Sequence, residues 1–255
     1  RPLSQVQGAV DHWELNTCIQ FKEVPPDYPK TFVRVVKGYG CSSNSVGRLR
    51  KDNRGHQQLS IGVGCGTAEA IHEMGHVLGF EHEHGRSDRN TYITMYSRSY
   101  NGWTPEQTQH HTRNQVPYDF TSVMHRYPAI PSTCVTGKSK ILMPHNPYNI
   151  RLISHRKVLS WRDIKAANLA YKCIDKWRAH HPHSRACYNE GYTGKDGKCN
   201  CPPGTRGETC QIKYADYYPP LTCGGNVTEA TTIQPNSSYR QERCMWWIQA
   251  PDCNK

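Results

Sequence analysis

Two stretches of the sequence space their apolar residues regularly. Residues 68–78 contain good helix formers, and apolar side chains stand at positions 71, 74, 77 and 78, as on one face of a helix. Gly79 follows directly, and a glycine in that place is typical of a helix C-terminus. The pattern therefore predicts a helix over residues 68–78 that ends near Gly79.

A shorter stretch before that helix has a two-residue period. Leu59, Ile61 and Val63 alternate with serine and glycine residues, which predicts a strand with one apolar face. No apolar run approaches the roughly 20 residues that a transmembrane helix requires. The sequence therefore predicts no membrane span.

The amino-acid composition indicates the cellular compartment and the kinds of partner to expect. The 255 residues include 12 cysteines, more than a reduced cytosolic protein normally carries, so we expect disulfides and an oxidising, extracellular setting. The formal net charge is +11, and residues 151–185 contribute +7 of it. A solvated basic linker explains that segment, and an acidic partner such as a polyanionic matrix sugar is the alternative. No nucleic-acid-binding motif accompanies the charge, so nucleic acid is not an expected partner.

The predicted helix carries the residues of a metal site. His72 and His76 lie four residues apart, so both imidazoles leave the same helix face, one turn apart. Gly79 lets the chain reverse, and His82 then brings back a third nitrogen. A structural zinc site normally has four protein ligands, whereas three ligands and one open position are typical of a catalytic site. We therefore predict Zn²⁺ held by His72, His76 and His82.

Glu73 is the candidate general base of this site. It follows His72 by about 100° of helix rotation, which places its carboxylate beside the metal but outside the ligand set. Zinc lowers the pKa of a coordinated water to roughly 7. The carboxylate can take that proton as the water attacks a carbonyl, and can return it to the departing amine. The pattern predicts peptide-bond hydrolysis with Glu73 as the catalytic residue.

These residues resemble a known family. The motif His72-Glu73-x-x-His76-x-x-Gly79-x-x-His82 is the metzincin signature, and its continuation to residue 89 resembles the astacins. Further astacin-like stretches are residues 13–21, 40–41 with 46–48, 57–60 with 64–65, and 122–125. The resemblance covers roughly residues 5–175. It implies a two-lobed α+β catalytic domain with zinc in the cleft, a secreted endopeptidase that cleaves extracellular proteins.

The resemblance also assigns roles outside the motif. Met124 would form an apolar turn beneath the zinc. Astacins carry a tyrosine two residues after that methionine, as a fifth ligand and oxyanion donor, whereas this chain has Arg126 there and Tyr127 next. Three alternatives stay open: Tyr127 reaches the metal after a one-residue shift, Arg126 faces the oxyanion, or neither reaches. By the same resemblance, residues 9–20 form the first helix. The strand over 59–63 forms the rim of the cleft, where an extended peptide adds.

The cysteines divide the chain into three parts. The resemblance pairs Cys18 with Cys173 and Cys41 with Cys65 in a catalytic domain over residues 1–175, whose N-terminal strand is missing. Residues 176–212 are a linker and a segment that resembles half of an EGF-like module, with four cysteines instead of six. Its expected disulfides are Cys187–Cys199 and Cys201–Cys210.

Residues 213–255 resemble the start of a CUB domain, with Cys223 paired to Cys244. They are too few for a complete β-sandwich, and the chain opens without the pattern of a signal peptide. We therefore expect a fragment at both ends. Cys134 and Cys253 are left over: they either bridge each other, or Cys253 awaits a partner in a missing CUB segment. Asn226 and Asn236 stand in glycosylation sequons.

The function expected from these observations is that of a secreted zinc endopeptidase. Its partners would be protein substrates, with matrix or cuticle precursors as candidates. The alternative is a matrix-binding EGF/CUB protein whose protease domain is weak or inactive. Arg126, the missing N-terminal strand and the truncated CUB start favour this alternative, whereas the intact histidine motif with Glu73 opposes it.

Overall fold

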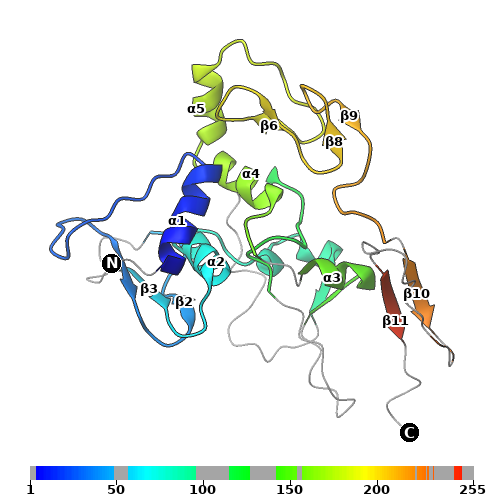
Figure 1. The fold of residues 1–255 in the computed structure, drawn as a ribbon, viewed down its shortest axis with the longest axis horizontal. Helices are drawn as coiled ribbons and strands as arrows, with labels where there is room; N and C mark the ends of the chain where they lie inside the picture. The colour runs from blue at the N-terminus through cyan, green and yellow to red at the C-terminus, as the bar shows by residue number, and fades with distance from the viewer. Residues whose placement is uncertain are drawn as a thin grey trace, which may run out of the picture.

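The computed structural model describes residues 4–48, 57–95, 115–126, 142–153, 157–221, 223–227, 229, 232 and 244–248. Its helices are α1 (Ser4–Asn16), α2 (Thr67–Val77), α3 (Ile150–Ile153), α4 (Trp161–Ala170) and α5 (Cys173–His180), with 3-10 turns η1 (Glu83–Gly85), η2 (Arg89–Thr91) and η5 (Pro147–Asn149). Its strands are β1 (Val33–Val36), β2 (Cys41–Ser43), β3 (Gln57–Ile61), β4 (Ile93–Met95), β5 (Leu142–Pro144), β6 (Tyr192–Thr193), β7 (Cys199–Asn200), β8 (Thr205–Arg206), β9 (Ile212–Lys213), β10 (Cys223–Val227) and β11 (Cys244–Ile248). Figure 1 shows the first sheet with α1 and α2 at one end of the molecule and β10 and β11 at the other.

The first sheet has the strand order β1-β3-β2. Strand β1 runs parallel to β3, and β2 runs antiparallel to it. Because β3 is paired on both sides, its main chain cannot accept a further strand, and the edges of the described sheet are β1 and β2. The expectation that the strand over 59–63 forms the rim of the cleft is therefore wrong. Of the two edge strands, β2 is the one that packs beside α2.

Strand β3 is also shorter than the alternation predicts. Leu59 and Ile61 are buried, as predicted, but Val63 is 88% exposed and lies beyond the end of the strand. The amide of Gly62 donates to the carbonyl oxygen of Gly40, and a Cβ on Gly62 would collide with the carbonyl oxygen of Gly38. This close approach of two backbones turns the chain before Val63 can join the apolar face.

Helix α2 confirms the helix predicted over 68–78, within one residue at each end. Helix α1 begins five residues before the expected range 9–20 and ends four residues before its end. Just after its last residue, the Thr17 hydroxyl donates to the Trp13 carbonyl oxygen at 2.7 Å. The buried Trp13 indole donates to the Ile71 carbonyl oxygen at 3.1 Å and so fixes α1 against α2.

Five disulfides join segments within the described residues. They are Cys18–Cys173, Cys41–Cys65, Cys187–Cys199, Cys201–Cys210 and Cys223–Cys244. The first closes a sequence separation of 155 residues and links the end of α1 to the start of α5. A cross-link over so long a loop removes much chain entropy from the unfolded state. Cys134 and Cys253 lie outside the described residues.

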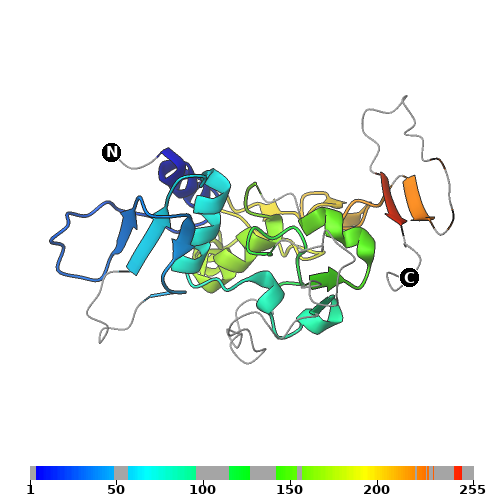
Figure 2. The same ribbon diagram turned by 90° about the horizontal axis from the view of Figure 1, so that it is seen from below.

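The tail of the chain is built from small paired strands. Strands β6 and β7 form one antiparallel pair, and β8 and β9 form another. Strands β10 and β11 form a parallel pair, which lies beside η5 at the end of the molecule away from the first sheet (Figures 1 and 2). Among the described helices, none is both long enough and apolar enough to cross a membrane.

Candidate zinc centre and active site

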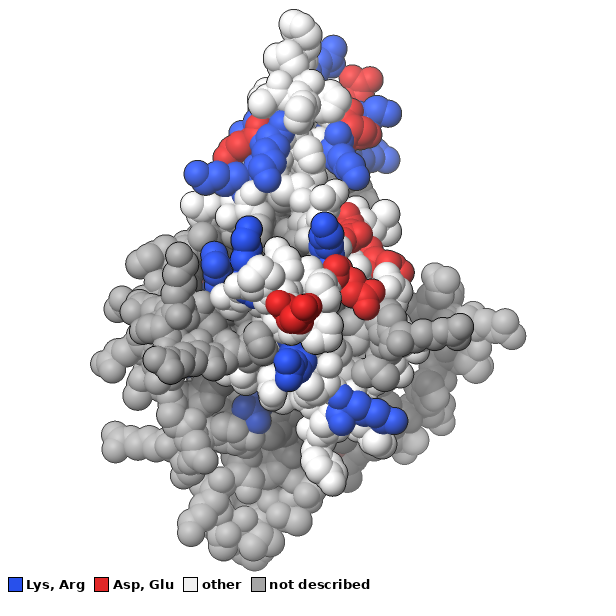
Figure 3. Space-filling model, turned by 90° about the vertical axis from the view of Figure 1, so that its left-hand side faces the viewer, with Lys and Arg blue, Asp and Glu red and all other residues white. Residues whose placement is uncertain are grey.

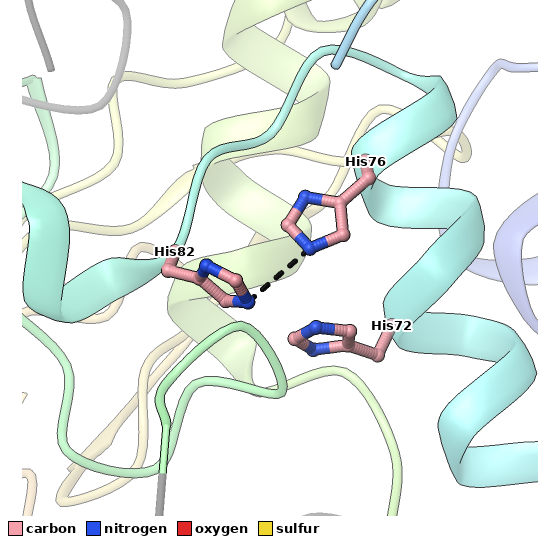
Figure 4. A group of neighbouring side chains, drawn as sticks. All are labelled: His72, His76 and His82. Atoms are coloured by element: carbon pink, nitrogen blue, oxygen red, sulfur yellow. Dashed lines mark hydrogen bonds between the residues drawn. The ribbon is translucent and has the colours of Figure 1, made fainter. Parts of the chain in front are cut away.

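The three histidines of the motif converge from two directions. His72 and His76 leave the same face of α2, and His82 enters from the segment after Gly79, whose φ is +91° (Figure 4). The Nε2 atoms of His76 and His82 are 3.3 Å apart. One ligand nitrogen from each of the three rings lies within 4.8 Å of the others. Two nitrogens bound to a tetrahedral zinc at about 2.0–2.1 Å are themselves about 3.3–3.4 Å apart, so the donor set fits zinc.

Two of the rings are oriented by backbone carbonyl groups. Nδ1 of His72 lies 2.7 Å from the carbonyl oxygen of Val123, and Nδ1 of His76 lies 2.7 Å from that of Phe80. A carbonyl oxygen only accepts, so each Nδ1 carries the proton and each Nε2 presents a lone pair. A hydrogen bond from the second ring nitrogen to a carbonyl group is the usual arrangement for metal-binding histidines.

The third ring is held neutral by its surroundings. Burial lowers the pKa of His82 far below its ordinary value, and the neighbouring His76, His84, His72 and Arg126 lower it further. A neutral imidazole is the form that binds a metal ion. His82 is therefore neutral near pH 7, in the form that can bind a metal ion.

Glu73 is buried on α2, where it lies between His72 and His76 in the sequence. Its side chain is 8% exposed, and no side chain or backbone group of the described residues donates to its Oε2. Burial raises the pKa of this carboxyl group, and a hydrogen bond from the backbone of Ser43 opposes the rise. A buried carboxylate oxygen without a protein partner is costly unless water or substrate meets it. This is the arrangement that a general base requires.

The turn at Met124 packs directly against helix α2. Met124 is buried, and a Cβ placed on Gly75 would lie 2.6 Å from its sulfur. Gly75 stands between Glu73 and His76 in the motif, so the absence of a side chain there lets the turn approach the helix. The amide of Glu83 donates to the Met124 carbonyl oxygen at 3.0 Å and joins the turn to the segment of His82.

Asp163 binds the two residues that precede Met124 in the turn. Its Oδ1 accepts from the Ser122 hydroxyl at 2.6 Å, and its Oδ2 accepts from the amides of Val123 at 2.8 Å and Ser160 at 3.1 Å. The sequence did not single out this residue. The pattern Ser160-x-x-Asp163 is a capping box that predicts the start of α4, but nothing in the pattern indicates that the same carboxylate reaches the turn.

The residues after the turn are only partly within the described chain. The amide of Arg126 donates to Nδ1 of His84 at 3.3 Å, and its carbonyl oxygen accepts from Nδ1 of His125 at 2.8 Å. The charge of Arg126 contributes to the lowered pKa of His82. Tyr127 lies outside the described residues, so its role stays a prediction.

Residues 2–172 match the family model described as Astacin, a peptidase family. The chain belongs to the astacin family of zinc metalloendopeptidases. The described catalytic part accordingly has an astacin-like fold of mixed helices and strands. The histidine triad is the part of this fold that can bind the zinc of the family.

Similar proteins support the assignment to this family. Blastula protease 10 of Paracentrotus lividus is 33% identical over 97% of this chain and 42% of its own length. Zinc metalloproteinase nas-36 of Brugia malayi is 35% identical over 88% of this chain and 38% of its own length. The solved structure of High choriolytic enzyme 1, a hatching enzyme zinc-protease from the medaka fish Oryzias latipes, is 30% identical with a TM-score of 0.51, and the match covers 67% of this chain and 82% of that one. The chain spans about two fifths of the length of the curated relatives it matches.

Proposed function

We propose that this astacin is a secreted endopeptidase that hydrolyses peptide bonds of extracellular proteins. The zinc ligands are His72, His76 and His82, and Glu73 is the general base. The observation that carries the proposal is the convergence of three imidazole nitrogens beside a buried carboxylate whose Oε2 has no partner within the described chain. All five defining residues of the motif, His72, Glu73, His76, Gly79 and His82, are present in this chain.

The chain's own groups account for the proton movements of the reaction. When bound, zinc supplies Lewis-acid polarisation of the scissile carbonyl and of the attacking water. Glu73 takes a proton from that water and returns it to the departing amine nitrogen. The raised pKa of Glu73 makes it a stronger base than an exposed glutamate. Arg126 or Tyr127 would donate to the oxyanion, a role worth about 10²–10³ in rate when one donor is lost.

The edge of the first sheet supports binding of an extended peptide. Strand β2 ends at Ser43, whose backbone donates to the Glu73 carboxylate. No further strand of the described residues pairs with the outer side of β2. A substrate strand added there would run past the general base, with its own amides and carbonyls pairing with β2. This assignment replaces the central strand that the sequence predicted for the rim.

The tail supports an extracellular setting. The strand pairs β6–β7 and β8–β9 with their two disulfides are consistent with an EGF-like segment over 176–212. The Cys223–Cys244 disulfide across β10 and β11 is consistent with the start of a CUB domain. Asn226 is exposed on β10 and accepts from the Tyr148 hydroxyl, so it is accessible for glycosylation; Asn236 lies outside the described residues. Matrix or cuticle precursors are the proposed substrates.

Charge does not add a specific partner to this proposal. On the face shown in Figure 3, Lys and Arg side chains are interspersed with acidic ones and do not merge into one patch. Arg162 is paired with Glu190 at 3.3 Å, and Arg185 with Glu208 at 3.0 Å. Part of the basic charge of residues 151–185 is thus neutralised within the protein.

Zinc-dependent hydrolysis by the full chain tests the proposed function. We expect one zinc per chain, cleavage of peptides from a denatured proteome, loss of cleavage after chelation, and recovery on adding zinc. The cleavage-site profile from the same experiment would give the substrate preference. A chain that holds one zinc and cleaves nothing would instead support the matrix-binding alternative with an inactive protease domain.

A further inference from the structure

Two tyrosines of the tail lie against the catalytic domain. They are Tyr217 and Tyr218, in the segment that leads from β9 to β10 (Figure 1). Both are half-buried, whereas Tyr214 of the same segment is 62% exposed. A connection between two modules has no need to bury aromatic side chains. The contacts of this pair therefore indicate a role beyond joining the modules.

The Tyr218 hydroxyl lies among polar groups of residues 118–120. The amide of Phe120 donates to it at 3.0 Å, and the hydroxyl oxygen is 3.1 Å from both the Tyr118 carbonyl oxygen and Oδ1 of Asp119. The Arg162 guanidinium is 3.4 Å away. Burial, with the charge of Asp119, raises the pKa of Tyr218, so the hydroxyl keeps its proton and remains a donor.

Tyr217 strengthens the same attachment through Arg162. The guanidinium carbon of Arg162 lies 3.9 Å from the centre of the Tyr217 ring, which is a close cation–π contact. The same guanidinium donates to the Tyr118 carbonyl oxygen at 3.0 Å. The Tyr217 hydroxyl is 3.4 Å from Oδ2 of Asp119. Tyr217 thus contacts the Asp119 side chain and the arginine that binds the Tyr118 carbonyl oxygen, while Tyr218 contacts the backbone of the same residues.

That piece of backbone supports the zinc ligands. The amide of Asp119 donates to Oε1 of Glu83 at 2.9 Å, and Glu83 directly follows the ligand His82. The amide of Glu83 donates in turn to the carbonyl oxygen of Met124. Glu83 is buried, and Arg86 lies 3.2 Å from the same Oε1. A shift of residues 118–120 would therefore move the segment that presents His82.

A second route leads from the same backbone to the end of the Met124 turn. Tyr118 and His125 are both buried, and the Tyr118 hydroxyl donates to Nε2 of His125 at 2.7 Å. The other ring nitrogen of His125 donates to the carbonyl oxygen of Arg126. Tyr118 therefore connects the contact of Tyr218 with the residue that stands where astacins carry their tyrosine.

We propose that Tyr218, assisted by Tyr217, is a positioning residue of the zinc site and holds the backbone that presents His82 and Arg126. The tail after the EGF-like segment is then a working part of the catalytic domain. This inference rests on the proposed function for its effect on hydrolysis, but its effect on zinc retention is independent of hydrolysis.

The test compares full-length Tyr218→Phe with wild type and with the control Tyr214→Phe. The phenylalanine keeps the ring and removes only the hydroxyl, which leaves the Phe120 amide without its acceptor. Loss of a hydrogen bond of this kind changes the equilibrium constant between the ordered and the displaced backbone by about 3- to 10-fold. We expect zinc release to a chelator to be faster by about that factor, kcat to fall equally, and KM to stay within about twofold. The control should match wild type in all three.

The outcomes separate the inference from simpler roles. A lower melting temperature for Tyr218→Phe with wild-type zinc release and kcat would show that the tyrosine only attaches the tail, and would overturn the inference. The second variant, Tyr217→Phe, removes the longer hydroxyl contact and should shift zinc release in the same direction by less. If wild type hydrolyses no peptide, the proposed function fails, while the zinc-release comparison still decides this inference.

Discussion

Replacing Glu73 by Gln is expected to lower kcat/KM for peptide hydrolysis by about 10²–10⁴-fold, while the protein still binds one zinc. The amide has the shape of the carboxylate but cannot take a proton from water. The substitution leaves the proposed zinc ligands unchanged, since these are three histidines with nitrogens within 4.8 Å of one another. The measurement is steady-state kinetics on a peptide substrate together with zinc content by mass spectrometry.

Glu69→Gln is the matched control for this variant. Glu69 lies one turn earlier on α2, is exposed, and accepts from the Gly66 amide at 2.8 Å as part of the helix cap. Gln accepts in the same way, so kcat/KM should stay within about twofold of wild type. Equal activity of Glu73→Gln and wild type would remove Glu73 from the mechanism.

Replacing Asp163 by Ala is expected to reduce the free energy of unfolding by about 3–5 kcal/mol. The buried carboxylate accepts from the Ser122 hydroxyl and from the amides of Val123 and Ser160. Each buried donor left without an acceptor costs about 1–3 kcal/mol, and alanine leaves all of them unpaired. Urea unfolding of the zinc-loaded chain measures the loss.

Asp175→Ala controls for removing an acidic residue from a first helical turn. Asp175 occupies in α5 the place that Asp163 has in α4, but it is exposed. Its contribution is limited to the helix dipole, so the loss should stay below about 1 kcal/mol. Losses of similar size in the two variants would mean that Asp163 acts only as a helix cap and does not hold the Met124 turn.

Apart from the disulfides that the family resemblance implied, the features that the sequence predicted depend on neighbours along the chain. The spacing of His72, His76 and His82 on a helix followed by glycine determines their meeting point within one short segment. The structure brings these rings together at 3.3 Å between the Nε2 atoms of His76 and His82. Helix α2 could be located for the same reason, because its apolar face and its terminal glycine are both local signals.

The features that the sequence did not predict depend on contacts between distant segments. Asp163 reaches Ser122 across 41 residues, and Tyr218 reaches Tyr118 across 100 residues. No periodicity or motif encodes such contacts. The edge position of β2 also depends on how three strands pair, and the alternation in β3 is compatible with any place in a sheet. The end of that strand before Val63 required knowledge of the backbone packed against Gly62.

X-ray absorption at the zinc edge of the full chain directly tests whether His72, His76 and His82 bind the zinc. The account predicts a first shell of three imidazole nitrogens at about 2.0–2.1 Å with one further oxygen at similar distance, and two imidazoles in a His82→Ala variant. A shell that contains sulfur, or an unchanged imidazole count in His82→Ala, would contradict the assignment of His72, His76 and His82 as the ligands.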